Sequence, residues 1–505
     1  MTKLSGIRIT YTGLLSFVGG LISIVTGLIF TLIITRTLSP EQYGSWGLIN
    51  VLLLYVLMIG PIVSYWTTRE IARDTHSGKT SVLASFGLSV IATIVYLFIA
   101  YVMSIYSNVQ VDILLMGGIL IPAMFVNSIL SAINLGSKPH VVVYGTVAYG
   151  LTSIPFAFLF VNVLEIGIIG LLFSLLISYC VSIVIQFYYS YDKLKNNFNS
   201  KYIKKYLKYF WIPAYPSIAI IVAGLDISIF TILMGSVIGL AYWIAASVLP
   251  SMISHTGLIS RGVYAKLLGS DKKDYLEDNI IHVLFFGILL TSVVITFSRA
   301  GLYVLNPIYE FVFPVVMILA VDGFFTVLTN IFTQSLAGIE NVDKDNTSTF
   351  KDYVKSKLFL PPTLRLIQTC TYVVILTTGI LFLKNYSVSD VNLLIFWASI
   401  AVLTQIPLSL YLYVLVKRNL MIKIKRKHIL NYVLSAVIVF GLTYFISDHF
   451  LYYTNNLVVF LPNLLAYVIV SILGYFVVTS LLDNKAKYLL KSILKEIKEK
   501  SVRSK

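Results

Sequence analysis

Two carboxylates stand inside long apolar runs of the chain. Asp226 is flanked by Leu225 and Ile227, and Asp322 lies in the run Ile-Leu-Ala-Val-Asp-Gly-Phe-Phe. A charged side chain inside hydrocarbon is energetically costly, so such a residue is a candidate for function. It must either pair with a cation or take up a proton. Both residues are therefore candidates for a proton- or cation-coupling site or for the partner of an arginine, and a structural hydrogen bond to a neighbouring helix is the alternative.

Four arginines lie near the ends of apolar runs. Arg69 closes the second run and Arg261 follows the eighth. The guanidinium group presents a planar fork of donors that matches a phosphate, so these two predict a phosphate-binding mouth. Arg36, at the opposite end of the first run, is a candidate for releasing the same group. Arg365 lies six residues inside its run, from which its head can also reach back to the headgroups. The alternative for Arg69 and Arg261 is membrane topology, because basic residues gather in cytoplasmic loops.

The composition identifies the class of protein around these residues. Of the 505 residues, 58% are hydrophobic and 12% are charged, against about 45–50% and about 25% in soluble domains. A soluble enzyme and a disordered chain are both excluded, which leaves an integral membrane protein. The sequence has no G-x-x-x-x-G-K-[ST] and no H-E-x-x-H motif, and its two cysteines sit apart in apolar runs. We therefore expect no cofactor, no metal and no enzymatic activity.

Fourteen stretches of the chain are long and apolar enough to span a bilayer as helices, which needs about 20 residues each. This predicts an all-α polytopic membrane protein, with twelve spans and two buried or re-entrant helices as the alternative. Pro213 and Pro216 should bend or break the seventh helix, because each removes a backbone donor. The stretches are 10–35, 46–66, 82–106, 112–134, 141–161, 166–190, 209–234, 237–257, 280–298, 311–335, 359–383, 391–416, 429–447 and 457–482.

The positions of the basic residues predict the orientation. If the N-terminus is cytoplasmic, 34 of the 38 Lys and Arg residues fall in cytoplasmic segments, as the positive-inside rule requires. The net charge of +16 is therefore a topology signal, and nucleic acid is not an expected partner. We predict a multi-pass protein of the cell membrane with both termini cytoplasmic. Its basic loops and tail should contact anionic lipids.

The same segments divide the chain. An N-lobe of helices 1–6 covers 1–190, a basic cytoplasmic linker covers 191–208, and a C-lobe of helices 7–12 covers 209–416. Helices 13 and 14 follow at 417–482, and a basic amphipathic tail occupies 483–505. Because six is even, both lobes enter the membrane from the same side, as in transporters built from parallel repeats.

Two short motifs resemble those of a known family. The first helix ends in Thr-Arg-Thr-Leu-Ser-Pro-Glu-Gln-Tyr-Gly, residues 35–44, and the seventh carries Asp226, followed by Gly239 and the pair 242–243 (Tyr-Trp). These residues resemble the polysaccharide (O-antigen) flippases of the multidrug/oligosaccharidyl-lipid/polysaccharide exporter superfamily. The family often has Arg or Lys after the Asp, where this chain has Ile227. The resemblance implies two pseudo-repeated six-helix lobes around a central cavity that opens alternately to each side. Some relatives, the lipid II flippases included, have two further C-terminal helices.

The resemblance implies a secondary transporter that flips an oligosaccharide linked to polyprenyl phosphate or pyrophosphate to the outer leaflet, for polysaccharide or glycan biosynthesis. A proton or Na⁺ is the expected coupling ion. An ion-coupled exporter of multiple drugs or organic cations is the alternative within the superfamily, and the basic rims favour the anionic headgroup. A membrane-embedded glycosyltransferase or polymerase is a third class. It is disfavoured because the outer loops are short, apart from 299–310.

Overall fold

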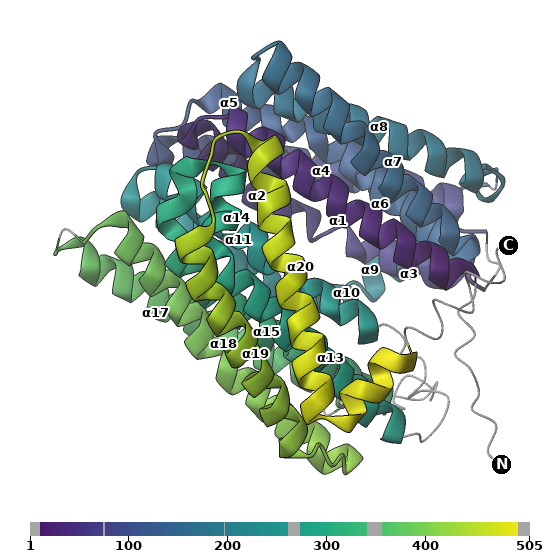
Figure 1. The fold of residues 1–505 in the computed structure, drawn as a ribbon. Coiled ribbons are helices and arrows are strands. Elements are labelled where there is room, and N and C mark those ends of the chain that lie inside the picture. The colour runs from purple at the N-terminus through teal and green to yellow at the C-terminus, as the bar shows by residue number, and fades with distance from the viewer. Residues whose placement is uncertain are drawn as a thin grey trace, which may run out of the picture. The chain divides into compact units, whose positions relative to one another are not determined.

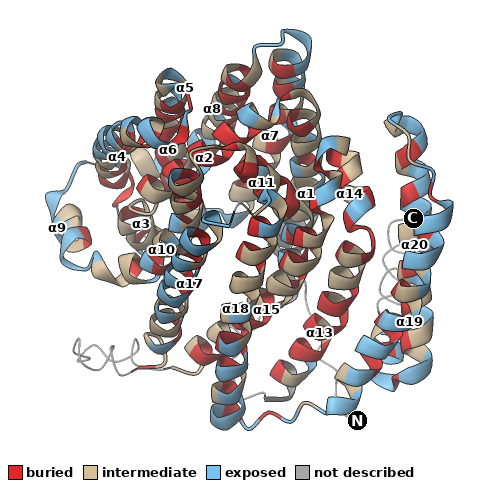
Figure 2. Ribbon diagram, turned by 90° about the vertical axis from the view of Figure 1, so that its left-hand side faces the viewer, coloured by how far each residue is buried: buried red, intermediate tan, exposed pale blue. Residues whose placement is uncertain are grey.

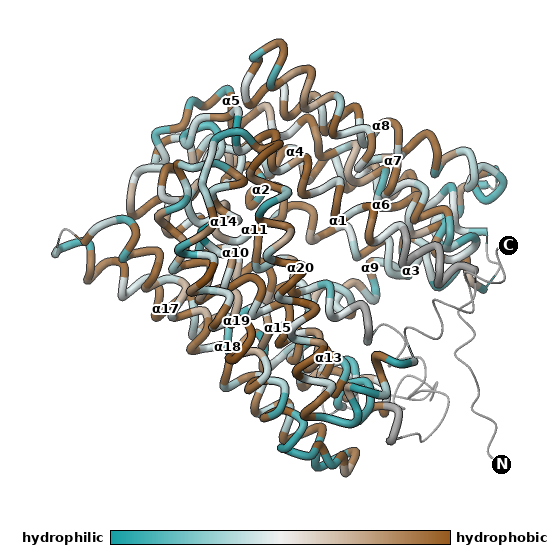
Figure 3. The backbone as a smooth tube through the Cα atoms, in the orientation of Figure 1, coloured by the Kyte–Doolittle hydropathy of each residue, from teal (hydrophilic) through white to brown (hydrophobic). Residues whose placement is uncertain are grey.

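The computed structural model is helical throughout the part of the chain that it describes (Figure 1). The described residues are 11–492 apart from 74–75, 196, 261–272, 341–355 and 387. Thirteen helices are long and apolar enough to cross a membrane, or fourteen if a bent pair counts as one span. The prediction of an all-α polytopic protein with about fourteen spans is confirmed. Hydrophobic residues run along most of each helix and hydrophilic ones gather near the ends (Figure 3).

The chain forms two compact units, Met1–Tyr242 and Trp243–Lys505. In unit 1, α7 and α8 form one extensive helix pair, α6 packs on α3, α4 and α8, and α1 packs on α7. The elements of unit 1 are α1 (Tyr11–Thr37), α2 (Pro40–Leu57), α3 (Pro61–Ile71), α4 (Gly78–Ser107), α5 (Val111–Met116), η1 (Gly117–Ile119), α6 (Leu120–Ser137), α7 (Pro139–Ala157), η2 (Phe158–Val163), α8 (Gly167–Leu194), α9 (Ser200–Lys208) and α10 (Trp211–Met234).

Helix α10 opens the second run of spans along the chain, after the basic linker. In space it packs against α2, α3 and α4, so it lies within unit 1. The boundary between the compact units therefore falls at Tyr242/Trp243, after the point at 209 where the sequence divides into lobes.

The second span is broken where the sequence predicts one straight helix over 46–66. Helices α2 and α3 meet at 57°. Pro61 begins α3 and cannot donate a backbone hydrogen bond, and the junction instead holds short-range bonds from Gly60 N to Leu57 O (2.9 Å) and from Ile62 N to Ile59 O (3.2 Å).

The seventh span is unbroken, although its sequence contains two prolines. Helix α10 runs without a break from Trp211 to Met234, so the predicted break at Pro213 and Pro216 is wrong. Pro213 lies in the first turn, where its missing N–H has no intrahelical partner to lose. Pro216 lies inside the helix and removes a single bond from it.

Gly44 of α2, the last residue of the first sequence motif, lies at a close contact. A Cβ atom there would come within 2.0 Å of the carbonyl oxygen of Val237, in the turn before α11. Gly239 is similarly close to the ring of Phe230, at 2.9 Å. Both positions therefore need glycine because the backbone approaches its neighbour too closely for a side chain.

Unit 2 is centred on α15 and α18, which form its most extensive helix pair, and α17 packs on α18. Helix α13 packs on α15, α19 and α20. The rings of Trp243 and Trp397 stack at 3.9 Å, and both side chains are buried. Buried residues recur along α13 (Figure 2). The remaining elements are α11 (Ile238–Ser251), which crosses the boundary between the units, η3 (Met252–Ser260), α13 (Lys273–Thr296), α14 (Ser298–Leu305), η4 (Pro307–Val312), α15 (Phe313–Gly338), α17 (Leu360–Lys384), α18 (Asp390–Leu420), α19 (Arg426–Phe450) and α20 (Leu457–Leu482).

Candidate transport site

Asp322 and Arg365 come together in unit 2. Asp322 lies near the middle of α15, and the hydroxyl of Thr326, one turn further on, lies beside its carboxylate. Arg365, in the second turn of α17, attracts that carboxylate electrostatically. Both side chains are half-buried. The two opposite charges thus lie on different helices within electrostatic reach of each other, which lowers the cost of holding either of them within the membrane.

Helix α18 carries a polar layer between these two helices. Gln405 donates from Nε2 to the Thr329 hydroxyl of α15 (2.9 Å), and Gln368 of α17 donates to the hydroxyl of Thr404 (3.0 Å). Sequence reasoning missed these residues. The signal was the adjacent polar pair Thr404-Gln405, two residues before Pro407, in an otherwise apolar run.

Asp226 lies in unit 1 with a different set of neighbours. Tyr55 of α2 donates its hydroxyl to the carbonyl oxygen of Gly224 (2.7 Å) and shares a hydrogen bond with Ser228 (2.8 Å). Its hydroxyl also interacts electrostatically with Asp226. Tyr55 therefore bonds α10 at residues two positions before and two positions after Asp226. The sequence gave no indication of this contact.

Of the arginines predicted at the rims, the structure describes Arg36 and Arg69, at the ends of two different helices. Arg36 is half-buried in the last turn of α1. Arg69 is exposed in the last turn of α3, where its guanidinium carbon lies 4.5 Å from the ring centre of Tyr65. Arg261 lies outside the described residues, so the predicted pairing of Arg69 with Arg261 stays a prediction.

A long apolar groove runs between α13, α15 and α19 in unit 2. Its volume is about 460 Å³, within the roughly 300–1,000 Å³ typical of ligand sites. Its wall is apolar apart from two hydroxyls of α13 and one tyrosine of α19. The lining residues are Ile288, Ser292, Ile295, Thr296, Met317, Val433, Ala436, Val437, Phe440, Gly441, Tyr444 and Phe445.

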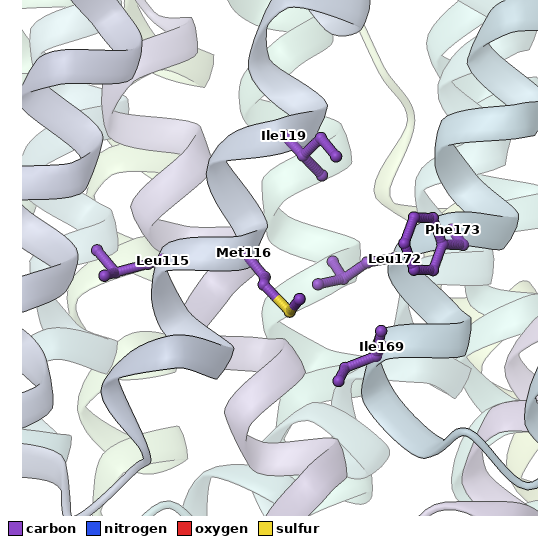
Figure 4. Close-up of a pocket in the computed structure, with 6 residues that line it drawn as sticks. All are labelled: Leu115, Met116, Ile119, Ile169, Leu172 and Phe173. Atoms are coloured by element: carbon purple, nitrogen blue, oxygen red, sulfur yellow. The ribbon is translucent and has the colours of Figure 1, made fainter.

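A smaller pocket in unit 1 has a different character (Figure 4). It holds about 110 Å³, and its six lining side chains from α5, η1 and α8 are all apolar. It is too small for a substrate and offers no polar group to orient one. Within the described ranges, no cluster of three or more His, Cys, Asp or Glu residues is placed to hold a metal ion.

Helices with these bounds and packing define the transporter fold of the multidrug/oligosaccharidyl-lipid/polysaccharide exporter (MOP) superfamily, as comparison with solved structures shows. The lipid II flippase MurJ, in an inward closed conformation, is similar with a TM-score of 0.64 and 16% identity, over 93% of this chain and 98% of MurJ. An inward-facing multidrug resistance MATE family transporter is similar with a TM-score of 0.56 and 14% identity, over 80% of this chain and 99% of that one. A MATE transporter in complex with MaD5 gives 0.53 and 14%, over 81% and 95%.

No family model matches the chain, and no curated protein matches it in sequence. At these identities the likeness to solved structures establishes the fold. The fold that the sequence motifs predicted is therefore confirmed, and the chain shares it with the flippase and the transporters named above.

Proposed function

We propose that this protein is a secondary transporter that flips an oligosaccharide linked to polyprenyl phosphate or pyrophosphate from the cytoplasmic to the outer leaflet, by alternating access. The observation that carries the proposal is the apolar groove between α13, α15 and α19. An exporter of small cations needs a polar site for its cargo, whereas a lipid-linked cargo also needs a path for its long apolar chain. The groove supplies such a path along the side of unit 2.

Helices α19 and α20 form the C-terminal helix pair, and contacts near both of its ends bind this pair to the rest of unit 2. Near one end, Arg299 lies 3.7 Å from Asp448. Near the other, Lys485 Nζ pairs with Asp278 at 2.9 Å. Between them, Tyr475 of α20 donates to the carbonyl oxygen of Phe285 (3.2 Å). Helix α20 is therefore bonded to α13, and α19, which packs on both, lines the groove together with α13 and α15.

The charged residues have proposed roles in the same cycle. Arg69 and Arg261 would meet the phosphate where the headgroup loads, Arg36 would meet it at release, and Arg365 would meet it within the membrane. Asp226 and Asp322 would couple transport to a proton or Na⁺. The coverage of the comparisons supports a lipid-linked cargo, because MurJ matches 93% of this chain and the MATE transporters about 80%.

The test of this proposal is a substitution that fills the groove, compared with a matched substitution elsewhere. Gly441 lines the groove, and a Cβ atom there meets no atom within 4 Å, so the backbone accepts a side chain and Gly441→Trp should place an indole in the groove. Gly87 of α4 is equally open and lies outside the groove, so Gly87→Trp is the matched control. In proteoliposomes carrying a fluorescent polyprenyl diphosphate sugar, we expect Gly441→Trp to abolish flipping and Gly87→Trp to flip at the parental rate. Equal flipping by both variants would remove the groove from the mechanism.

A second candidate function is ion-coupled export of organic cations, which the half-buried carboxylate Asp322 and the MATE structures favour. The same proteoliposomes distinguish the two. A lipid-linked sugar flipper leaves a fluorescent organic cation where it was added, whereas a cation exporter accumulates it under an ion gradient. The exporter should also be indifferent to Gly441→Trp, because its cargo has no chain to place in the groove.

A further inference from the structure

Helix α9 of the basic linker has an inner face that is bound tightly to unit 1. Tyr206 is 1% exposed and packs among Val63, Ile129 and Ala132. Its hydroxyl donates to Glu70 Oε2 (2.8 Å) and shares a hydrogen bond with Ser81 (2.9 Å). The linker is therefore a docked element of unit 1 over these nine residues.

Glu70 makes this docking specific to α3. It is 3% exposed, next to last in α3, and its second oxygen accepts a bond from Lys205 Nζ (2.9 Å). Lys205 also lies 5.6 Å from the ring of Trp66 on the same helix. A carboxylate buried this deeply depends on its cation, because losing one partner leaves an uncompensated charge. Helices α9 and α3 are therefore held together as one body.

The outer face of α9 combines lysines with an exposed apolar side chain. Lys201, Lys204 and Lys208 are exposed, and Leu207 lies among them with 62% of its surface open. Phe198 before the helix and Phe210 after it are also exposed, at 51% and 49%. Lysines beside exposed leucine and phenylalanine are typical of a helix that lies in a membrane interface.

The surroundings of α9 have the same character. Lysines lie over tyrosine rings in three neighbouring pairs: Lys138 over Tyr189 (5.9 Å), Lys195 over Tyr191 (4.8 Å) and Lys208 over Tyr209 (5.3 Å). Aromatic rings with basic side chains mark the headgroup level of a bilayer. Of the acids that the structure describes in this region, Asp192 is paired with Lys195 at 2.9 Å and Glu70 is buried, so the exposed described surface is positive.

We propose that the outer face of α9 binds anionic phospholipid headgroups through Lys201, Lys204 and Lys208, and that Glu70 transmits this attachment to α3. The lipid composition of the leaflet then restrains α3, the half of the second span that lies beyond its bend. The inference is independent of the transported substrate, because the lysines used face away from the packed interior of unit 1.

The binding test places a reporter at the centre of this face. In full-length protein whose Cys180 and Cys370 are replaced by alanine, Leu207→Cys carries an environment-sensitive fluorophore. In phosphatidylcholine nanodiscs, adding phosphatidylglycerol should shift its emission to the blue. The same label at Tyr386→Cys, on an exposed turn after α17, should not respond. An unchanged emission at 207 would overturn the proposal.

Removing three lysines from α9, and in a separate variant three lysines from another loop, tests whether lipid binding belongs to α9. Replacing Lys201, Lys204 and Lys208 by glutamine should abolish the blue shift. Replacing three exposed lysines at the α18–α19 connection, Lys417, Lys423 and Lys427, should preserve it. Loss of the shift in both triple variants would mean a general charge effect and would overturn the proposal. Farnesyl diphosphate is the competing source of phosphate: the same blue shift from it in pure phosphatidylcholine would assign the lysines to a substrate headgroup instead.

The coupling to α3 is tested separately by hydrogen exchange. Phosphatidylglycerol should slow amide exchange in α3 of the parental protein. Lys205→Met and Glu70→Gln should each lose this protection, while the fluorophore at 207 still responds. Lys205→Met keeps Tyr206 and its bond to Glu70, so it reports on coupling even if Glu70→Gln does not fold. If the amides of α3 in the parental protein exchange at the same rate with and without phosphatidylglycerol, the proposed coupling of α9 to α3 is refuted.

Discussion

The two intramembrane carboxylates have similar sequence surroundings and different structural ones. Asp322 in unit 2 faces a cation, Arg365, that belongs to another helix. Asp226 in unit 1 lies beside the hydroxyl of Tyr55, which is itself bonded to the backbone and to Ser228 of α10. A charge pair between helices loses its attraction when the helices separate. The Tyr55 hydroxyl also joins two helices, but its hydrogen bonds go to Gly224 and Ser228 and do not depend on the charge of Asp226.

Because of this difference, we expect Asp322 and Asp226 to have different roles, although their sequence surroundings are similar. The Asp322–Arg365 pair is suited to respond to helix movement or to an incoming anion, since a phosphate competes with the carboxylate for the guanidinium. The group around Asp226 is suited to hold α10 against α2. The experiments below test that distinction, beginning with the largest expected effect.

Arg365→Met should have the largest effect, because it leaves Asp322 facing an apolar side chain. Removing one member of a buried ion pair costs about 3–5 kcal/mol, and we expect less here because both side chains are half-buried and attract each other only electrostatically. Thermal unfolding in detergent measures this loss. The double variant Asp322→Asn/Arg365→Met should regain most of the stability and none of the transport. If the single variant is as stable as the parent, the two residues are not a pair.

Asp322→Asn alone should leave the protein inserted and folded but slow transport by about tenfold or more, equivalent to about 1.4 kcal/mol. The amide keeps the shape of the carboxylate and loses its charge, so Arg365 no longer alternates between acid and substrate. Initial rates in proteoliposomes give the effect, with insertion quantified in parallel. A parental rate would make Asp322 structural.

Asp226→Asn should also impair transport, by a smaller factor than Asp322→Asn. The bonds of Tyr55 to Gly224 and Ser228 do not involve the carboxylate, so the local structure remains. The same rate assay compares the two variants directly. An Asp226→Asn defect larger than that of Asp322→Asn would reverse the roles assigned to the two units.

Hydroxyl and amide bonds should have the smallest effects. Tyr55→Phe in unit 1 removes two hydrogen bonds between helices and Gln405→Leu in unit 2 removes one. Such a bond is worth about 0.6 kcal/mol on average in membrane proteins. Both variants should lower the unfolding temperature slightly, and Tyr55→Phe should lower it somewhat more. A loss at Gln405 several times larger than at Tyr55 would show that the polar layer of α18 supports the charge pair.

The helices were predictable because apolar length is a local property of the sequence. The bend before Pro61 and the intact helix through Pro216 were not, since one proline begins a helix and the other is tolerated within one. Asp322 and Arg365 were each recognisable as costly charges within the membrane. Their pairing depends on how α15 and α17 pack around α18, and 36 to 76 residues separate the polar partners of that helix. Nothing local signals that arrangement.

The bend between α2 and α3 also affects how the length of the second span matches the thickness of a bilayer. At 1.5 Å per residue, the 18 residues of α2 and the 11 of α3 measure about 27 Å and about 17 Å. End to end they would exceed the hydrocarbon thickness of about 30 Å and would have to tilt or thicken the bilayer. Turning by 57° lets α2 match that thickness almost alone. With α2 across the bilayer, α3 would be inclined to α2 by 57°, and the hydrophobic mismatch of an overlong span would be relieved within the chain rather than by the surrounding lipid.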